Sequence, residues 1–471
     1  MQWGVWLTLA TQALKCERHG EATRLTCVEC GKPICPKCAV RTDVGLKCEA
    51  DAKGVELSKE TLALLRPSRT PLYMGLAGAV VFIALLAFLL TRGGDEAGET
   101  NTAALPAVGA WSPVPDLVNI RGTTTVVLLK DGKALAAGGG VGQIAIAASE
   151  IFDPTAGVWQ NTGAMNQARR GHQAVLLGDG KVLVAGGISE GELLASAEVY
   201  DPGTGRWTTV APMNTPRLGA TLTLLANGNV LATGGTSADT AAGAGGGQTI
   251  RPDNTAEIYN TQANRWTRTA AAMSTPRFEH TATLLDDGRV LIAGGQGPPI
   301  SGSSAALATT EIYDPAVDSF RKSNDMGDAR FNHAAVKLPD RTVMVVGGAG
   351  GTNGDTSLAT AEVFNPGDGS WTSAGALSGS RTGHVATVFS DGRVLVAGGE
   401  SVTRGSRRSL ASAEIFTLDK REWRSAGNMN CPRSEASAAL LGDGSVLVVA
   451  GDFAAPGQQP DPKGCADRYR P

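Results

Sequence analysis

The sequence predicts an all-β protein: a seven-bladed β-propeller over residues 111–471, closed by an N-terminal strand and preceded by a small cysteine-rich module and one transmembrane helix. Three observations support this fold. A segment of the type RVLVAGG recurs seven times at intervals of about 50 residues, a period typical of propellers and solenoids. Glycine is abundant, at 61 of 471 residues, which suits a chain with many tight turns. A tryptophan segment at residue 111 supplies the strand that the last repeat lacks.

Each repeat is predicted to open with a β-hairpin. An apolar run leads into a turn, and the second strand then carries the recurring segment. Its seven copies are Lys133–Gly139, Lys181–Gly187, Asn229–Gly235, Arg289–Gly295, Thr342–Gly348, Arg393–Gly399 and Ser445–Gly451. Six copies follow an Asp-Gly or Asn-Gly dipeptide, which favours a two-residue hairpin turn because both residues tolerate positive φ. The exception is Asp340-Arg341.

Aromatic residues mark the third and fourth strands. The third-strand aromatics are Phe152, Tyr200, Tyr259, Tyr313, Phe364, Phe416 and Tyr469, and the first six are followed seven residues later by Trp159, Trp207, Trp266, Phe320, Trp371 and Trp423. The chain stops before the seventh repeat reaches a fourth strand. We therefore expect the segment at Trp111 to pair with the strand that contains Tyr469 and to close the ring. Closure removes two exposed sheet edges.

The glycine pair and the two aromatics, at these offsets, resemble the kelch repeat over residues 111–471. The resemblance implies a scaffold that binds a protein or a glycan. It leaves open a carbohydrate-active enzyme, because galactose oxidase is a related seven-bladed protein, although its copper site is not recognisable here. The sequence shows no nucleophile motif, nucleotide loop or paired catalytic carboxylates, so no enzyme is expected. A cluster of acids and aromatics from different blades at the channel mouth would favour an enzyme instead.

Charged residues recur in register with the repeats. Seven arginines (Arg121, Arg169, Arg217, Arg277, Arg330, Arg381, Arg433) are matched by seven third-strand acids (Glu150, Glu198, Glu257, Glu311, Glu362, Glu414, Asp467). One acid per arginine predicts an internal ion pair in each blade rather than an anion site. Four histidines follow such arginines by three residues: His172, His280, His333 and His384. Equivalent positions in four blades favour a structural role over copper binding.

The loops between second and third strands vary most, and variable loops on a rigid scaffold usually carry recognition. Candidate binding residues on this face are Arg251, Arg404, Arg407 and Arg408. Cys431 and Cys465 fall toward the same face of the last blade, which makes a disulfide between them a hypothesis.

The N-terminal module, residues 15–54, reads as a zinc site. The module contains four pairs of metal-binding side chains, and two residues separate the members of each pair. This spacing suits tetrahedral Zn²⁺. The stretch resembles the B-box zinc finger, which implies that Cys16, His19, Cys35 and Cys38 hold one ion and Cys27, Cys30, Cys48 and Asp51 a second. Asp51 departs from the usual Cys or His, so one or two structural ions remain open. A cytosolic protein partner is expected for this module. Residues 1–14 receive no role.

Residues 72–90 are uncharged and, as a helix, span about 28 Å, which predicts a membrane crossing; a buried core helix is the alternative. Residues 55–71 form a basic juxtamembrane segment, and residues 91–110 a flexible linker. The positive-inside rule then predicts a single-pass protein with a cytoplasmic N-terminus and an extracytoplasmic propeller, in the periplasm or at the cell surface. A net charge of -3 argues against binding to nucleic acid.

Overall fold

The computed structural model describes residues 109–471, except for 240–248, 301–302, 352–353, 454–460 and 463–464, together with the backbone of four short strands near the N-terminus. Those strands are β1 (Leu14–Lys15), β2 (Ala22–Thr23), β3 (Ala39–Thr42) and β4 (Gly45–Cys48). β1 pairs with β2, and β3 with β4. The chain divides into two compact units, Met1–Thr102 and Ala103–Pro471.

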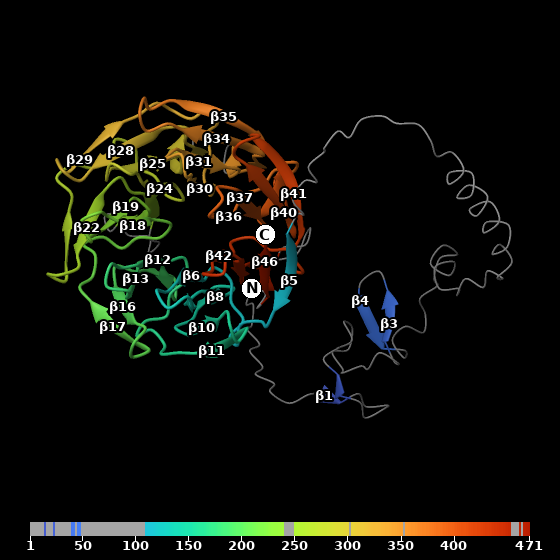
Figure 1. Ribbon diagram of the computed structural model, residues 1–471. Helices are drawn as coiled ribbons and strands as arrows, with labels where there is room; N and C mark the ends of the chain where they lie inside the picture. Colours follow the sequence, from blue (N-terminus) through green and yellow to red (C-terminus); the bar gives the residue numbers. More distant parts are fainter. Residues whose placement is uncertain are drawn as a thin grey trace, which may run out of the picture. The chain divides into compact units, whose positions relative to one another are not determined.

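The second unit is a β-propeller (Figure 1). Among the residues that the structure describes, seven four-stranded antiparallel sheets share one strand order, and we call them blades 1 to 7. Their innermost strands neighbour one another around the ring, including the last and the first. From the inside outward, blades 1 to 4 consist of β6 (Thr125–Leu128), β7 (Ala134–Ala137), β10 (Ser149–Asp153) and β11 (Val158–Asn161); β12 (Gln173–Leu176), β13 (Val182–Ala185), β16 (Ala197–Asp201) and β17 (Arg206–Val210); β18 (Thr221–Leu224), β19 (Val230–Thr233), β22 (Ala256–Asn260) and β23 (Arg265–Arg268); and β24 (Thr281–Leu284), β25 (Val290–Ala293), β28 (Thr310–Asp314) and β29 (Ser319–Lys322).

Blades 5 to 7 repeat the pattern. They consist of β30 (Ala334–Lys337), β31 (Val343–Val346), β34 (Thr360–Phe364) and β35 (Trp371–Ala376); β36 (Val385–Val388), β37 (Val394–Ala397), β40 (Ser412–Thr417) and β41 (Glu422–Asn428); and β42 (Ser437–Leu440), β43 (Val446–Val449), β46 (Ala466–Arg470) and β5 (Ala110–Val114). The outermost strand of blade 7 thus comes from the N-terminal end of the propeller.

The pairing of β5 with β46 confirms the predicted closing strand. Trp111 lies opposite Tyr469, and their ring centroids are 5.1 Å apart. The Trp111 indole N–H also donates to the carbonyl of Ala426 in blade 6, at 2.9 Å. Trp423 makes the same bond from blade 6 to Ala374 of blade 5, at 3.0 Å. The borrowed strand therefore makes the same contacts as a strand that belongs to its own repeat.

The apolar core lies between neighbouring blades. All four residues of every second strand are buried, and their side chains alternate toward the two adjacent blades. Leu183 of blade 2, for example, clusters with Val230 and Tyr259 of blade 3. A similar cluster joins Leu447 of blade 7 to Phe152 of blade 1. Packing is thus continuous around the ring, and no blade buries its faces alone.

The predicted type of hairpin turn is wrong. In blade 1 the amide of Leu129 donates to Lys133, and the amide of Gly132 donates to Leu129. Only the glycine has positive φ, at 83°. This is a three-residue loop with a left-handed glycine, and the Asp131 carboxylate accepts the Lys133 amide at 3.1 Å. An Asp-Gly dipeptide is compatible with both turn types, so the dipeptide did not distinguish them.

Small hairpins occupy the loops between second and third strands. They are β8–β9 (Gly140–Val141, Ile144–Ala145), β14–β15 (Ile188–Ser189, Glu192–Leu193), β20–β21 (Thr236–Asp239, Thr249–Pro252), β26–β27 (Gln296–Ile300, Ser303–Ala306), β32–β33 (Ala349–Gly350, Thr356–Ser357), β38–β39 (Glu400–Thr403, Ser406–Ser409) and β44–β45 (Asp452–Phe453, Asp461–Pro462). We call the segment between the last strand of one blade and the first strand of the next a link. Each hairpin begins with a β-bridge to the link that enters its own blade, such as the bridge from Thr382 to Glu400. Hairpins and links therefore share one end of the ring, which we call the hairpin face.

The predicted transmembrane helix, residues 72–90, lies outside the described residues, as do residues 1–13, the juxtamembrane segment 55–71 and residues 91–108. Every named element in the described part is a β-strand, and that part contains no helix long and apolar enough to cross a membrane. The predicted localisation, single-pass with a cytoplasmic N-terminus and an extracytoplasmic propeller, is corrected on this finding and is not proposed further.

Candidate functional site

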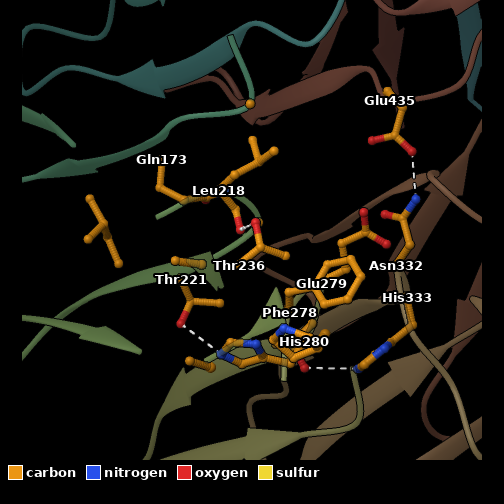
Figure 2. A pocket seen from close by; sticks show the side chains of 18 of the residues that line it. Gln173, Leu218, Thr221, Thr236, Phe278, Glu279, His280, Asn332, His333 and Glu435 are labelled. Carbon is orange, nitrogen blue, oxygen red and sulfur yellow. Dashed lines mark hydrogen bonds between the residues drawn. The ribbon is translucent and has the colours of Figure 1, made fainter. Parts of the chain in front are cut away.

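A cavity of about 1320 Å³ opens among the links of the hairpin face. Links that enter six of the seven blades contribute to its lining, so the cavity lies at the centre of the ring. Its polar lining includes Arg170, Arg251, Glu279, Asn332 and Glu435, with Phe278 and Leu218 as apolar neighbours (Figure 2). Mixed polar and apolar lining in a concave site of this size is typical of ligand binding.

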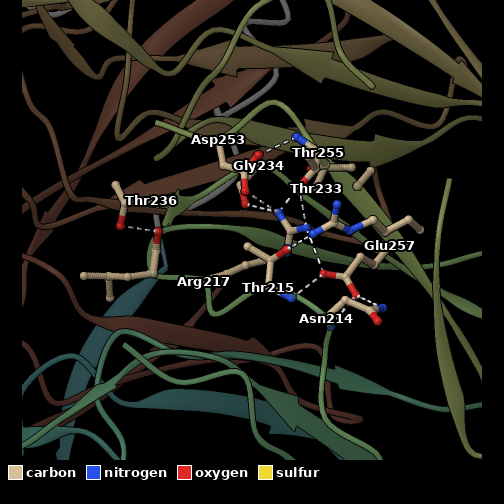
Figure 3. Close-up of polar contacts among 12 residues, drawn as sticks. Asn214, Thr215, Arg217, Thr233, Gly234, Thr236, Asp253, Thr255 and Glu257 are labelled. Atoms are coloured by element: carbon tan, nitrogen blue, oxygen red, sulfur yellow. Dashed lines mark hydrogen bonds and ion pairs between the residues drawn. The ribbon is translucent and has the colours of Figure 1, made fainter. Parts of the chain in front are cut away.

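The scaffold beneath the cavity is a buried ion pair in each blade. The Arg217 guanidinium donates to the Glu257 carboxylate at 3.0 Å and to the carbonyl of Gly234 at 2.7 Å (Figure 3). The same carboxylate accepts the backbone amides of Asn214 and Thr215. The arginine thereby ties the incoming link to the second strand and to the third strand of one blade.

All seven predicted pairs form: Arg121–Glu150, Arg169–Glu198, Arg217–Glu257, Arg277–Glu311, Arg330–Glu362, Arg381–Glu414 and Arg433–Asp467. This confirms their predicted internal role. Every arginine is essentially inaccessible to solvent, so none is placed to bind an external anion.

The glycine pairs let neighbouring blades approach. The second glycine of blade 3, Gly235, donates its amide to the carbonyl of Arg277 in the link to blade 4, at 2.9 Å. A Cβ on the first glycine, Gly234, would lie 2.4 Å from the same carbonyl oxygen. In blades 1 to 6 the repeated Gly-Gly therefore permits close backbone contact between blades, whereas blade 7 has Ala450 in place of the first glycine, also with positive φ.

The position two residues after each buried arginine faces the channel, and we call it the channel position. Its seven residues are Thr123, Gly171, Gly219, Glu279, Asn332, Gly383 and Glu435, all with φ between 45° and 66°. Backbone hydrogen bonds join several of these residues around the channel. The backbone amide of Glu279 donates to the carbonyl of Gly219, and the backbone amide of Asn332 donates to the carbonyl of Glu279. Glycine suits this left-handed conformation best, and a larger residue here costs about 1 kcal/mol or more of strain.

Three polar channel-position side chains, those of Glu279, Asn332 and Glu435 in the links to blades 4, 5 and 7, line the cavity together. The side-chain amide of Asn332 donates to a Glu435 carboxylate oxygen at 2.6 Å. The same oxygen lies over Gly383, where a Cβ would approach it to 2.5 Å. Glu279 lies on the same side of the cavity (Figure 2), and no hydrogen bond joins its carboxylate to another described residue. Asn332 therefore positions Glu435, while Glu279 is left available.

Four carboxyls around the mouth have raised pKa values. Burial raises the pKa of Glu279 to about 7, and the charge of Glu435 adds to the shift. Burial also raises the pKa of Glu435, Glu400 and Asp452. The Arg407 guanidinium opposes the shifts of Glu279, Glu435 and Glu400, and Arg170 opposes that of Asp452. A bound cation would do the same, since it stabilises the charged form.

The four predicted binding arginines have different surroundings. Arg251 lines the cavity. Arg407, on β39, pairs with Glu400 at the mouth. Arg404 and Arg408 are exposed on the same hairpin and lie outside the cavity lining. Sequence reasoning missed the channel-position residues Glu279, Asn332 and Glu435, although their departure from the glycine of other repeats was a usable signal.

Three of the four repeated histidines, His172, His280 and His333, hydrogen-bond to the preceding blade. His280 Nε2 forms hydrogen bonds with the hydroxyls of Thr221 and Thr233 in blade 3, and His333 Nε2 forms one with the hydroxyl of Thr281 in blade 4 (Figure 2). Burial lowers the pKa of His172, His280 and His384 to about 3 and that of His333 well below its usual value. These rings are therefore neutral packing elements near pH 7.

Cys431 and Cys465 form a disulfide in blade 7, with Cα atoms 6.5 Å apart. The Arg433 guanidinium donates to both cysteine carbonyls, at 3.2 and 2.7 Å. The disulfide thus crosses the ion-pair scaffold of the blade that also receives the closing strand.

Only Cys48 of the eight predicted zinc ligands falls within the described residues, at the end of β4 opposite Ala39. Cys16, His19, Cys27, Cys30, Cys35, Cys38 and Asp51 lie outside them. The predicted donor set, six thiolates with one imidazole and one carboxylate, fits zinc chemistry.

Comparison with known proteins agrees with this architecture. The kelch motif matches residues 169–214 and 381–430, and the B-box zinc finger matches residues 11–43. Kelch-like protein 36 of Mus musculus is 27% identical over 194 residues, 41% of this chain and 30% of the relative. Kelch-like protein 34 of Homo sapiens is 26% identical over 205 residues, again 30% of the relative. The chain therefore matches less than a third of the length of these proteins.

Two oxidases are also similar. Galactose oxidase of Gibberella zeae is 39% identical over 95 residues, 19% of this chain and 14% of the relative. A copper-bound fungal alcohol oxidase of the AA5 family superimposes with a TM-score of 0.62 over 78% of this chain and 77% of its own, at 17% identity, which shows a shared fold. The chain thus carries kelch motifs on a β-propeller and, before them in the sequence, a B-box zinc finger.

Proposed function

We propose that the chain is a two-part protein-interaction scaffold, in which a closed seven-bladed propeller binds a protein partner on its hairpin face. The observation that carries the proposal is the channel position. The ring repeats its ion pairs in every blade, yet the channel position departs from glycine at Thr123, Glu279, Asn332 and Glu435, and all four residues line one cavity. Departures from a repeat that bring strain without helping the fold are expected where a protein binds something.

The hairpins around the cavity extend this surface. β32–β33 and β38–β39 join across blades 5 and 6 into one four-stranded sheet, with Thr356 opposite Thr403. Its outer strand, β39, carries exposed Arg407 and Arg408, and Arg404 is exposed at the turn before it. A partner seated over the cavity would contact this sheet at its edge.

The test is site-specific photo-crosslinking in the full chain. A photoreactive residue at Arg408, on the hairpin face, should give discrete adducts with a protein partner in cells of the source organism. The control places the same residue at Gln262, which is exposed on the β22–β23 turn at the opposite end of blade 3. Equal or stronger adducts at Gln262 would contradict the proposed face.

For the N-terminal module we propose structural zinc that shapes a second protein-docking unit. Cys16, His19, Cys35 and Cys38 would hold one ion, and Cys27, Cys30, Cys48 and Asp51 a second. Metal analysis of the full chain tests this: two ions per chain are expected, and Asp51→Ala should release one and keep the other. Unchanged zinc content in that variant would remove Asp51 from the ligand set.

A carbohydrate-active enzyme is the second candidate. Acids and an aromatic from different blades do meet at the mouth, as Glu279, Glu435 and Phe278. A carboxyl with a pKa of about 7 can act as a general acid near neutral pH. This function predicts turnover of chromogenic glycosides that Glu279→Gln abolishes. Turnover that survives Glu279→Gln would exclude this residue as the acid.

A further inference from the structure

We propose that the cavity on the hairpin face receives a cationic side chain, an arginine or lysine of the protein partner, between Glu279 and Glu435. The proposal rests on the proposed function, because it names the chemistry by which that partner is recognised. Glu279 comes from the link to blade 4 and Glu435 from the link to blade 7, so the two carboxylates approach the cavity from well-separated parts of the ring.

The first argument is the division of labour between the two carboxylates. Asn332 donates to Glu435 at 2.6 Å and fixes that carboxylate over Gly383. Such a bond leaves the other oxygen of Glu435 and both oxygens of Glu279 as acceptors. A guanidinium presents several N–H groups in one plane and an ammonium presents three, and either can satisfy two separate carboxylates.

The second argument is that the cations already near the mouth have other partners. Arg407 pairs with Glu400 and remains half exposed. Arg170 donates to Gln143 and attracts Asp452. Arg407 nonetheless acts on Glu279 and Glu435 through its charge, since it opposes the rise in pKa of both. The chain thus brings three guanidiniums to the mouth, those of Arg170, Arg251 and Arg407, which indicates the kind of group that the mouth attracts.

The third argument concerns Glu279 itself. Its carboxylate is partly buried and has no hydrogen-bond partner among the described residues, while its backbone holds a left-handed conformation with φ of 53°. Glycine serves the fold at the equivalent position in blades 2, 3 and 6. A carboxylate placed at the cost of strain and burial is explained if a ligand pairs with it. Phe278 and Leu218 in the same lining suit the aliphatic stem of a long basic side chain.

The test is calorimetric titration of the full chain with three short peptides that differ at one residue: arginine, lysine or citrulline, the last being the neutral counterpart of arginine. The arginine peptide should bind at least about tenfold more tightly than the citrulline peptide near pH 8. Affinity should fall about tenfold between pH 8 and pH 6, because Glu279 takes up a proton, while Glu435, Glu400, Asp452 and Arg407 modulate the midpoint.

The variant pair Glu279→Gln and Glu435→Gln should reduce the affinity for the arginine peptide to that for the citrulline peptide. Glu190→Gln is the matched control, since Glu190 is exposed on the β14–β15 hairpin of the same face and outside the cavity lining; it should change nothing. Equal affinities for the arginine and citrulline peptides, or no arginine binding up to about 10 mM, would overturn the proposal.

A free amine is the other source of the same charge. Agmatine, which carries a guanidinium without a peptide backbone, serves as the probe, and tighter binding of agmatine than of the arginine peptide would overturn the assignment to a partner's side chain. Crosslinking through position 408 separates the two proposals. If adducts form at position 408 but the arginine and citrulline peptides bind equally, only this inference is contradicted. If peptide binding depends on charge but no hairpin-face adducts form, the proposed function is contradicted.

Discussion

Two positions in each link, only two residues apart, follow opposite rules. The first is arginine in all seven links, buried and paired with an acid of its own blade. The second is the channel position, which is occupied by threonine, glycine, glutamate or asparagine. The arginine faces into the blade and the second residue faces the cavity. Uniformity therefore marks what the ring needs to stay folded, and variation marks the residues that we propose recognise a partner.

The largest expected effect comes from breaking the uniform position. Arg217→Ala leaves Glu257 buried and unpaired and should lower the free energy of unfolding by about 3–5 kcal/mol, measured by chemical denaturation. Lys181→Ala is the control, because Lys181 and Asp201 form an exposed pair 42% and 37% accessible to solvent. Its cost should stay below about 1 kcal/mol. Similar losses in both variants would refute the structural role of the buried pairs.

The disulfide tests whether the closing blade differs from the other six. Cys431→Ser with Cys465→Ser should lower the free energy of unfolding by about 3–4 kcal/mol, from the loop of 34 residues that the bond constrains in the unfolded chain. A reducing agent should reproduce the loss in the natural chain and have no effect on the double variant. Retention of full stability after both cysteines are replaced would mean that the borrowed strand alone holds blade 7.

Removing the charge at the channel position should raise the free energy of unfolding, whereas the two changes above lower it. The folded-state pKa of Glu279 lies at about 7, above its ordinary 4.5. The folded protein therefore loses stability as pH rises through that interval, because ionisation is easier in the unfolded chain. Glu279→Gln removes this loss and should raise the free energy of unfolding by about 1–2 kcal/mol near pH 8, after allowance for solvent in the cavity. Near pH 4 the difference should vanish. A gain independent of pH would show that ionisation is not its cause.

The smallest expected effect concerns the glycine between Asn332 and Glu435. Gly383→Ala places a methyl 2.5 Å from the Glu435 carboxylate oxygen and should displace it. Gly132→Ala is matched, since it shares the positive φ but has open space around the new methyl. Both variants carry backbone strain of about 1 kcal/mol. Only Gly383→Ala should weaken binding at the cavity, and equal effects on binding would detach Glu435 from recognition.

The scaffold was predictable from sequence because its residues recur at fixed offsets. The internal repeat predicts the pairing of Arg217 with Glu257, the pairing of Trp111 with Tyr469 and the β-hairpins, and the structure confirms all three. The turn type was not, because Asp131-Gly132 suits two loop geometries that differ in hydrogen bonding rather than composition.

The cavity was not predictable in the same way. Glu279, Asn332 and Glu435 share one offset, two residues after a repeated arginine, but that position holds threonine, glycine, glutamate or asparagine, so the repeat alone does not single these three out. Their common feature is a backbone conformation and a direction toward the channel, which only the closed ring brings together. All four predicted binding arginines lie in the variable loops, but the sequence does not show that Arg251 and Arg407 lie nearer the mouth than Arg404 and Arg408.

The most direct measurement compares one chemical change at two sites of the same ring. Glu257→Gln and Glu279→Gln each remove one negative charge, and both are unfolded with denaturant near pH 8. If repeated acids hold the fold and the channel-position acid serves recognition, Glu257→Gln lowers the free energy of unfolding and Glu279→Gln raises it. A loss of stability of the same size in both variants would contradict that division.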